Sequence, residues 1–189
     1  MIRISESGIG RAIVMLDGIP NGVPRAAMSA INKTIAGYRT DAKKEVVKRY
    51  EVGATAVHKS IEISRANKSA LSAFALSQGK PISLSKFKVK PKRVQRKGRN
   101  NKKIAVAVKK GGKMTTLNRA FIAKYKSDHI GVAERETRKR YPIKELYGPS
   151  IPKMLENEGV MRTLEGYAED RLRKNLDHEV YRIMKGYGK

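Results

Sequence analysis

The chain has 189 residues and a formal net charge of +25, and 40% of its residues are apolar. This length suits one compact domain with its own core. The chain contains no cysteine, which excludes disulfides, thiolate nucleophiles and cysteine-ligated zinc. No apolar run approaches the roughly 20 residues that cross a bilayer. The apolar patch at residues 12–16 is short and follows Glu6, so we expect neither a membrane span nor a signal peptide.

The positive charge is concentrated in the middle of the chain. Residues 1–62 hold 10 basic and 6 acidic side chains, residues 63–127 hold 19 basic and none acidic, and residues 128–189 hold 13 basic and 11 acidic. The middle third therefore carries a strong positive field, which requires an anionic partner. Nucleic acid, an acidic protein surface and an anionic membrane all fit this requirement.

The first strong element is a helix over residues 24–50, after a short predicted strand at residues 1–7 and a weak helix at residues 8–19. Pro24 suits the first turn of a helix. Apolar side chains then recur every three or four positions, as one stripe along a helix requires, at Met28, Ile31, Ile35, Tyr38, Ala42, Val46 and Tyr50. We expect this stripe to face the core and the lysines to face solvent.

The apolar period changes to two residues from Ile61 onward, which is the strand period. The same period recurs in the segments around residues 73–75, 82–84, 104–108, 121–122 and 130–132. Glycine-containing turns separate these segments. The pattern predicts an antiparallel sheet of about four or five strands in a basic, β-rich region over residues 61–135.

The sequence SKFKVKPKRV begins a predicted basic hairpin within this region. Lys88 and Lys90 alternate with Phe87 and Val89, so in an extended chain the lysines share one face at a spacing of about 6.6 to 7 Å. The predicted contact residues of the hairpin, for nucleic acid or an acidic partner, are Lys86, Lys88, Lys90, Lys92, Arg93, Arg96, Lys97, Arg99, Lys102, Lys103, Lys109, Lys110 and Lys113.

The partner of this hairpin stays open at the level of sequence. Counterion release would reward contact with a phosphate backbone, whereas a solvated loop or an acidic protein partner fits the same pattern, and a membrane surface is a third alternative. No aromatic residue interleaves with the lysines, so base stacking on single strands is not indicated.

A second long helix is predicted over residues 157–185. Its apolar stripe has the helical period and consists of Val160, Leu164, Tyr167, Leu172, Leu176, Val180 and Ile183. The chain is therefore predicted to adopt an α+β fold. In this fold the antiparallel sheet with its basic hairpin is packed by a long N-terminal and a long C-terminal amphipathic helix.

Catalytic chemistry is not indicated. His58, His129 and His178 are scattered and lack the spacing of a metal site, and residues 63–127 contain no carboxylate for a two-metal centre. We therefore expect no enzyme, no metal, no cofactor and no small-molecule substrate.

The segment YPIKELYGPSIPKML at residues 141–155 is rigid and apolar. Pro149 and Pro152 exclude an uninterrupted helix. The segment resembles the PI-x-x-LYGPS-x-P-x-ML motif that the minor tail protein Z family of tailed bacteriophages places before its C-terminal helix. AINKT at residues 30–34 and GKPISLSKFKVK at residues 79–90 add weaker resemblance to the same family.

This resemblance implies a single tail-completion domain over residues 1–189, in a protein of the virion that is assembled in the bacterial cytoplasm. Members of the family act in tail completion, head–tail joining and DNA passage at the head-proximal end of the tail. Implied partners are the tail terminator, the tail tube, the head–tail connector, further copies in a ring and the viral DNA, with no membrane contact.

The proline-rich segment at residues 141–155 is a candidate docking segment. Its prolines reduce the entropy lost on ordering, and the predicted subunit-docking residues are Leu146, Tyr147, Gly148, Pro149, Ile151, Pro152 and Met154. The alternative is a purely internal connection between a strand and the last helix.

Two rival functions remain at this stage. A ribosomal-type nucleic-acid-binding protein would share the pI of about 10.4 and the basic hairpin. A nuclease would require the acidic residues of the C-terminal part to converge in space.

Overall fold

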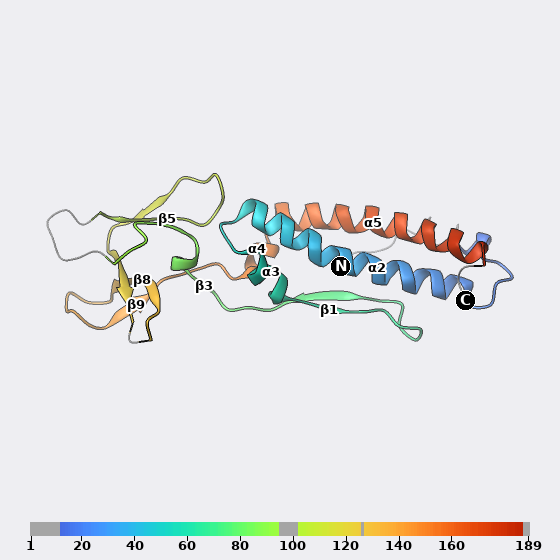
Figure 1. Cartoon of the computed structure of the whole chain (residues 1–189), viewed down its shortest axis with the longest axis horizontal. Coiled ribbons are helices and arrows are strands. Elements are labelled where there is room, and N and C mark those ends of the chain that lie inside the picture. The colour runs from blue at the N-terminus through green and yellow to red at the C-terminus, as the bar shows by residue number, and fades with distance from the viewer. Residues whose placement is uncertain (1–11, 95–101, 126, 187–189) are drawn as a thin grey trace.

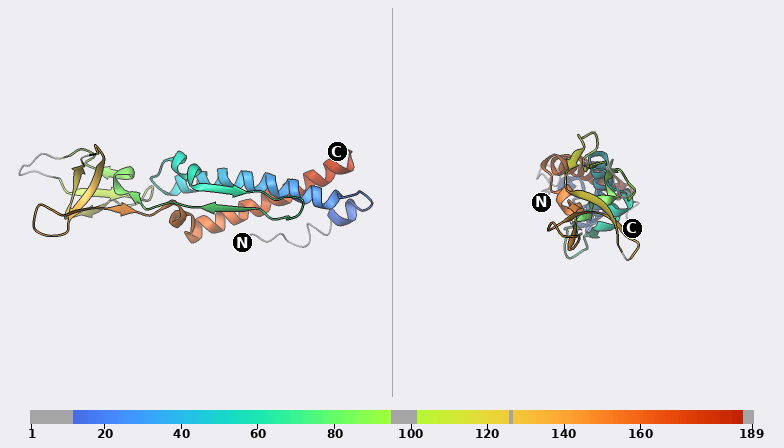
Figure 2. Two further views of the ribbon diagram at one scale, coloured as in Figure 1. Left: turned by 90° about the horizontal axis from the view of Figure 1, so that it is seen from below. Right: turned by 90° about the vertical axis from the view of Figure 1, so that its left-hand side faces the viewer.

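The computed structural model describes residues 12–94, 102–125 and 127–186. The molecule is elongated, with two long helices side by side at one end and small β-sheets at the other (Figures 1 and 2). We call these parts the helical half and the β half, the latter spanning residues 80–148. The strand predicted at residues 1–7 and the first part of the helix predicted at residues 8–19 lie outside the described residues, whereas residues 12–15 are helical.

The helical half is built on α2 (Gly22–Arg49) and α5 (Glu158–Met184). These helices run antiparallel. Lys33, in the first half of α2, contacts Glu179 near the end of α5, whereas Arg49, the last residue of α2, contacts Gly159 at the start of α5. Both helices lie within two residues of their predicted bounds.

The predicted apolar stripes are confirmed only in part. Most of the α5 stripe is buried, as are Ala42 and Val46 of α2, but Tyr167 is 48% exposed. In the first half of α2 the buried face consists of Ala26, Ala30 and Thr34, whereas the predicted Met28, Ile31, Ile35 and Tyr38 are only half-buried.

Two clusters of buried side chains hold the helical half together. The cluster at the outer end contains Ala12, Leu16, Ala26, Ala30, Leu172, Leu176, Val180 and Ile183. The other cluster begins with Ala42, Val46, Val160 and Leu164 of the helix pair and continues into the β half. The small side chains Ala26, Ala30 and Ala42 have 0% exposure, which indicates close approach of the α2 backbone to its neighbours.

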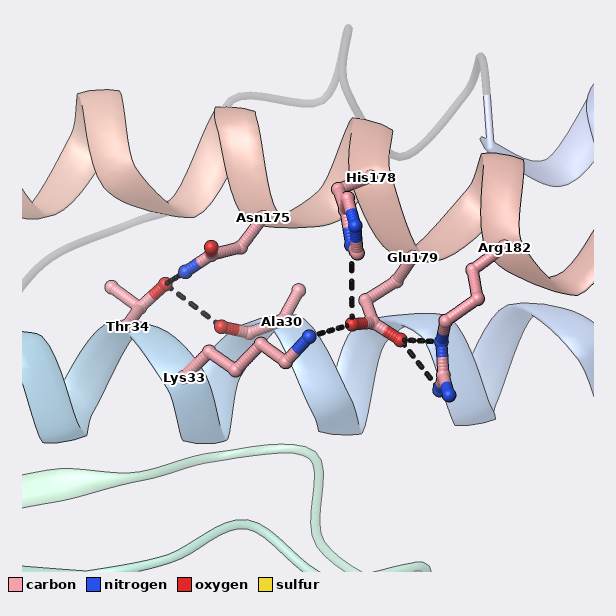
Figure 3. A network of polar contacts seen from close by, with 7 residues as sticks. All are labelled: Ala30, Lys33, Thr34, Asn175, His178, Glu179 and Arg182. Carbon is pink, nitrogen blue, oxygen red and sulfur yellow. Dashed lines mark hydrogen bonds and ion pairs between the residues drawn. The ribbon is translucent and has the colours of Figure 1, made fainter. Parts of the chain in front are cut away.

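A buried polar network also joins the two helices (Figure 3). The side chain of Glu179 is 0% exposed and forms ion pairs with Lys33 and with Arg182, the latter at 2.8 Å. Asn175 Nδ2 donates to Thr34 Oγ1 at 3.0 Å. Burial alone would raise the pKa of Glu179, but hydrogen bonds from Lys33 and Arg182 hold that pKa below its ordinary value.

A hairpin lies along the helix pair (Figure 1). It follows α3 (Ala54–Ser60) and consists of β1 (Ile61–Ser64) and β2 (Phe74–Ser77), paired antiparallel with Ile61 opposite Ser77. Its long connection is fixed to α2, because the Asn32 side chain both donates to the Ala66 carbonyl and accepts from the Ala66 amide, at 3.0 and 2.8 Å.

The β half contains the remaining strands. They are β3 (Ile82–Ser83), β4 (Lys88–Lys90), β5 (Ile104–Ala107), β6 (Thr115–Leu117), β7 (Ala120–Lys124), β8 (Ile130–Arg135), β9 (Ile143–Glu145) and β10 (Tyr147–Gly148), with the 3-10 turn η1 (Leu84–Lys86) after β3. They form the sheets β4-β5-β6, β7-β8-β9 and β3-β10.

The single sheet of four or five strands that the sequence predicts is not observed. Within the described residues the strands form four antiparallel sheets of two or three strands. The two-residue period identifies a strand but does not specify its neighbour, and these strands are two to six residues long, so each offers few side chains to select a partner. The long helices accordingly pack on each other and on the β1-β2 hairpin instead of covering one broad sheet.

The two halves meet at α4 (Ile151–Leu155). Ser150 caps this short helix by accepting from the Lys153 amide at 3.4 Å. Ile151, Met154 and Leu155 are buried in the cluster that also contains side chains of α2, α5 and the β half. One core therefore runs through the junction and connects the halves.

Candidate functional site

The predicted alternation of β4 is present in the structure. Lys88 and Lys90 are exposed, whereas Phe87 and Val89 are buried in the main core. The described members of the predicted contact set are all exposed, namely Lys86, Lys88, Lys90, Lys92, Arg93, Lys102, Lys103, Lys109, Lys110 and Lys113. Arg96, Lys97 and Arg99 lie outside the described residues.

The register of the β4-β5-β6 sheet gives its charged face a definite composition. Lys88 is paired with Ala107, and Lys90 with Ala105, which is in turn paired with Thr116. Because directly opposed residues point to the same side of a sheet, these five side chains share one face. The opposite face presents the Val89–Val106 pair to the core.

The basic residues of the predicted hairpin do not form one continuous surface. The backbone of Lys109 forms an isolated antiparallel β-bridge with Tyr50, and the Lys110 amide donates to the Arg49 carbonyl at 2.8 Å. These contacts bring the β5-β6 connection to the end of α2, near the junction of the two halves. Lys109, Lys110 and Lys113 are therefore separated from the cations around β4 and the start of β5, which lie farther from the helices (Figure 1).

A second basic segment emerges from the structure. The connection between β8 and β9 carries Arg138, Lys139 and Arg140, all exposed. It lies at the same end of the molecule as the outer ends of β4 and β5 in both lengthwise views (Figures 1 and 2). In the sequence this segment is the run RKR at residues 138–140. It is inconspicuous in the charge balance, because residues 128–189 also contain the acidic residues of α5.

The cations of the β half are largely uncompensated. Residues 80–148 contain 22 basic and 4 acidic side chains, a net charge of +18 out of +25. Within the described part of the chain, Lys88, Lys90, Lys92 and Arg138 make no ion pair. The positive field of this half is therefore directed outward.

The proline-rich segment has an internal role in the structure. Ile151 and Met154 are 6% and 0% exposed, and Leu146 packs against the same core. Gly148 is required by close approach, since a Cβ at this position would lie 2.7 Å from the Phe87 ring. Pro149 and Pro152 are half-buried. Among the predicted docking residues only Tyr147 is largely exposed, at 56%.

Glu145 anchors this segment through a set of side chains that are distant in sequence. Its Oε1 accepts from Ser83 Oγ at 2.5 Å and lies 2.8 Å from His129 Nε2, while Tyr147 OH donates to its Oε2 at 3.2 Å. Gly131 makes room for the carboxylate, because a Cβ there would lie 2.6 Å from Oε1. These contacts join β3, the β7-β8 turn, β9 and β10.

The electrostatic state of Glu145 follows from these contacts. Burial alone would raise its pKa, but hydrogen bonds from His129 and Ser83 hold the pKa below the ordinary value. The charge of Glu145 in turn raises the pKa of the Tyr147 hydroxyl. The carboxylate is therefore ionised as the folded chain reaches neutral pH.

Ser83, His129 and Glu145 do not have the arrangement of a hydrolytic triad. In such a triad the histidine lies between the serine and the acid, whereas here the serine and the histidine both contact Oε1 of the carboxylate. The arrangement suits a structural anchor. No group of three or more potential metal ligands occurs among the described residues.

None of the described helices combines the length and the apolar character that crossing a bilayer would need.

The charge distribution indicates a kind of partner, and a comparison with known families identifies the protein family. The helix pair carries a strongly basic β half, which is a surface for an anionic partner. The family model of prophage minor tail protein Z (GPZ) matches residues 7–187. The chain therefore belongs to this family of phage minor tail proteins, as its sequence motifs indicated. No curated protein and no solved structure matches it.

Membership of a minor tail protein family makes the chain a structural component of the virion. It indicates contact with other tail proteins, and the family is in general non-enzymatic. This assignment favours a tail protein over the ribosomal-type and nuclease alternatives.

Proposed function

We propose that the chain is a tail completion protein at the head-proximal end of the phage tail, where it takes part in head–tail joining and DNA passage. The observation that carries the proposal is the family match over residues 7–187. The whole chain acts as one unit in this role, because the core at α4 connects its two halves.

The partners follow from the same proposal. Neighbouring copies in a ring, the tail terminator, the tail tube and the head–tail connector provide the protein contacts, and the viral DNA passes the β half. The exposed ring of Tyr147 is the member of the docking segment that remains available for a neighbouring protein. Ile151 and Met154 act indirectly, because they fix the segment to its own subunit.

The experiment complements a phage that lacks this gene with variants of the chain. Without the protein we expect filled heads and tails that fail to join productively, seen by electron microscopy and as a loss of plaque titre. Tyr147→Ala should give the same defect with a normally folded subunit. Tyr147→Phe is the matched control, since it keeps the ring and removes only the hydroxyl that contacts Glu145.

Two results would contradict the proposal. Infectious particles at normal titre without the protein would exclude a role in completion. Normal joining with Tyr147→Ala would exclude the docking contact. Ile151→Asp is unsuitable for this purpose, because Ile151 is 6% exposed and a buried charge would unfold the subunit.

A further inference from the structure

Two basic elements lie at the end of the β half that points away from the helix pair. One is the face of the β4-β5-β6 sheet with Lys88 and Lys90, and the other is the β8-β9 connection with Arg138, Lys139 and Arg140. The outer ends of β4 and β5 and the β8-β9 connection all lie at this end in two perpendicular views (Figures 1 and 2). We call them together the basic end.

The sheet face in the basic end has the composition of a polyanion-binding surface. Beside Lys90 it presents the half-buried Ala105 and the exposed Thr116, whereas Ala107, opposite Lys88, is 5% exposed. None of the exposed large hydrophobic side chains of the described chain lies on β4, β5 or β6. Stable protein interfaces are organised around buried aromatic or aliphatic anchors, and this face offers none.

The chemistry that remains is that of phosphate recognition. Lysine and arginine neutralise backbone phosphates and release counterions, and hydroxyl groups donate to phosphate oxygens without reading the bases. The small side chain of Ala105 allows a phosphate backbone to approach the sheet beside Lys90. Tyr141, an exposed ring in the β8-β9 connection, has the Arg140 guanidinium 5.6 Å from its centroid, so that face of the ring is not available for stacking on a base.

We propose that the basic end binds duplex DNA through its phosphate backbone, without sequence preference. The inference rests on the proposed role in DNA passage and deepens it, because it specifies the mode of contact and the residues, but the binding itself requires no assembled tail. It also adds Arg138, Lys139 and Arg140 to the contact surface.

The test measures binding of the full-length chain to fluorescent 30-bp duplexes of two unrelated sequences, as a function of salt. Each lost phosphate contact lowers the slope of log K against log salt concentration by about 0.9. Lys88→Gln/Lys90→Gln should therefore reduce the slope by about 2 and weaken binding by on the order of 10- to 50-fold at 0.1 M salt. Arg138→Gln/Lys139→Gln should have an effect of similar size.

The matched control is Lys44→Gln/Lys48→Gln, which removes the same charge from exposed positions of α2. It should leave the slope within about 0.5 of the unmodified chain, because its lysines lie outside the basic end. Circular dichroism verifies that all variants are folded. The two duplex sequences should bind equally, and a single strand of the same length should bind no more tightly than the duplex.

Each contrary outcome overturns a defined part of the inference. An equal loss in the control variant would show a general charge effect. Poly-glutamate that competes with DNA at equal charge concentration would indicate an acidic protein partner, and a tenfold preference for single strands would exclude the duplex. Failure of DNA binding with normal head–tail joining would overturn this inference alone, whereas normal DNA binding with normal particles from the gene deletion would overturn the proposed function alone.

Discussion

The two halves of the molecule use charge in opposite ways. In the helical half, three carboxylates of low exposure are paired with cations, namely Glu45, Glu179 and, at 2.6 Å from Arg171, Asp41. In the β half, 22 basic side chains face 4 acidic ones, and one of these acids, Glu145, is engaged by the anchor at the proline-rich segment. Charge therefore specifies the internal fit of the helices, whereas in the β half it is available to a partner.

The largest expected effect concerns the junction that makes the halves one molecule. Met154 is 0% exposed in the shared core, whereas Met184 at the end of α5 is 50% exposed. Met154→Ala should lower the free energy of unfolding by about 2 to 5 kcal/mol, and Met184→Ala by less than about 0.5 kcal/mol. Urea unfolding measures both, and equal effects of the two substitutions would contradict the shared core.

The next effect concerns the internal charges of the helical half. Glu179→Gln leaves Lys33 and Arg182 without their counterion, so we expect a loss of about 1 to 3 kcal/mol in the free energy of unfolding. Glu169→Gln, at an exposed position on the same helix, is the control and should change it by less than about 0.5 kcal/mol. A neutral result for Glu179→Gln would mean that the buried pair does not contribute to helix pairing.

A pH dependence of stability should follow from the two carboxylates whose pKa is lowered on folding. Glu145 and Glu179 have folded-state pKa values below the ordinary 4.5, so each contributes stability that is complete above that value. This stability is lost as the pH falls through the lowered pKa. Unfolding in urea between pH 7 and pH 3 should show a decline below about pH 4.5 that is shallower in Glu145→Gln. An equally steep decline in this variant would show that Glu145 does not contribute to the pH dependence of the free energy of unfolding.

The smallest effect on stability is expected at the basic end. Lys88→Glu/Lys90→Glu changes exposed side chains that make no ion pair within the described residues, so the free energy of unfolding should change by less than about 0.5 kcal/mol. The same variant should abolish plaque formation, because reversed charge repels DNA. Wild-type titre would contradict the functional part, and a large loss of stability would show that these lysines have a structural role.

Local pattern in the sequence predicts much of this structure. The helices predicted at residues 24–50 and 157–185 correspond to Gly22–Arg49 and Glu158–Met184, because apolar residues recur at the helical period along both segments. The small residues Ala26 and Ala30, which form the buried face in the first half of α2, are not among the residues of the predicted stripe. The alternation at Phe87–Lys90 is likewise a local property. The class of protein could be predicted only from the resemblance of residues 141–155 to a family motif. Hydrophobic periodicity and charge do not specify it.

Other features depend on residues that are far apart in the chain. Ser83 and Glu145 are 62 positions apart, and neither is distinctive alone, so no spacing rule connects them. Pairing among short strands is similarly non-local. The strands β5 and β7 belong to different sheets, although the sequence predicts a strand at both positions. Ile151 and Met154 are apolar, which suits either a docking surface or a core, and the structure buries both in the core of their own subunit.

The most direct test of the division of labour places a photo-crosslinking side chain at position 88 or at position 44 in assembled particles. We expect the side chain at position 88 in the β half to crosslink to viral DNA, whereas the one at position 44 on α2 should crosslink to no DNA. Crosslinking of DNA at position 44 with none at position 88 would contradict the account.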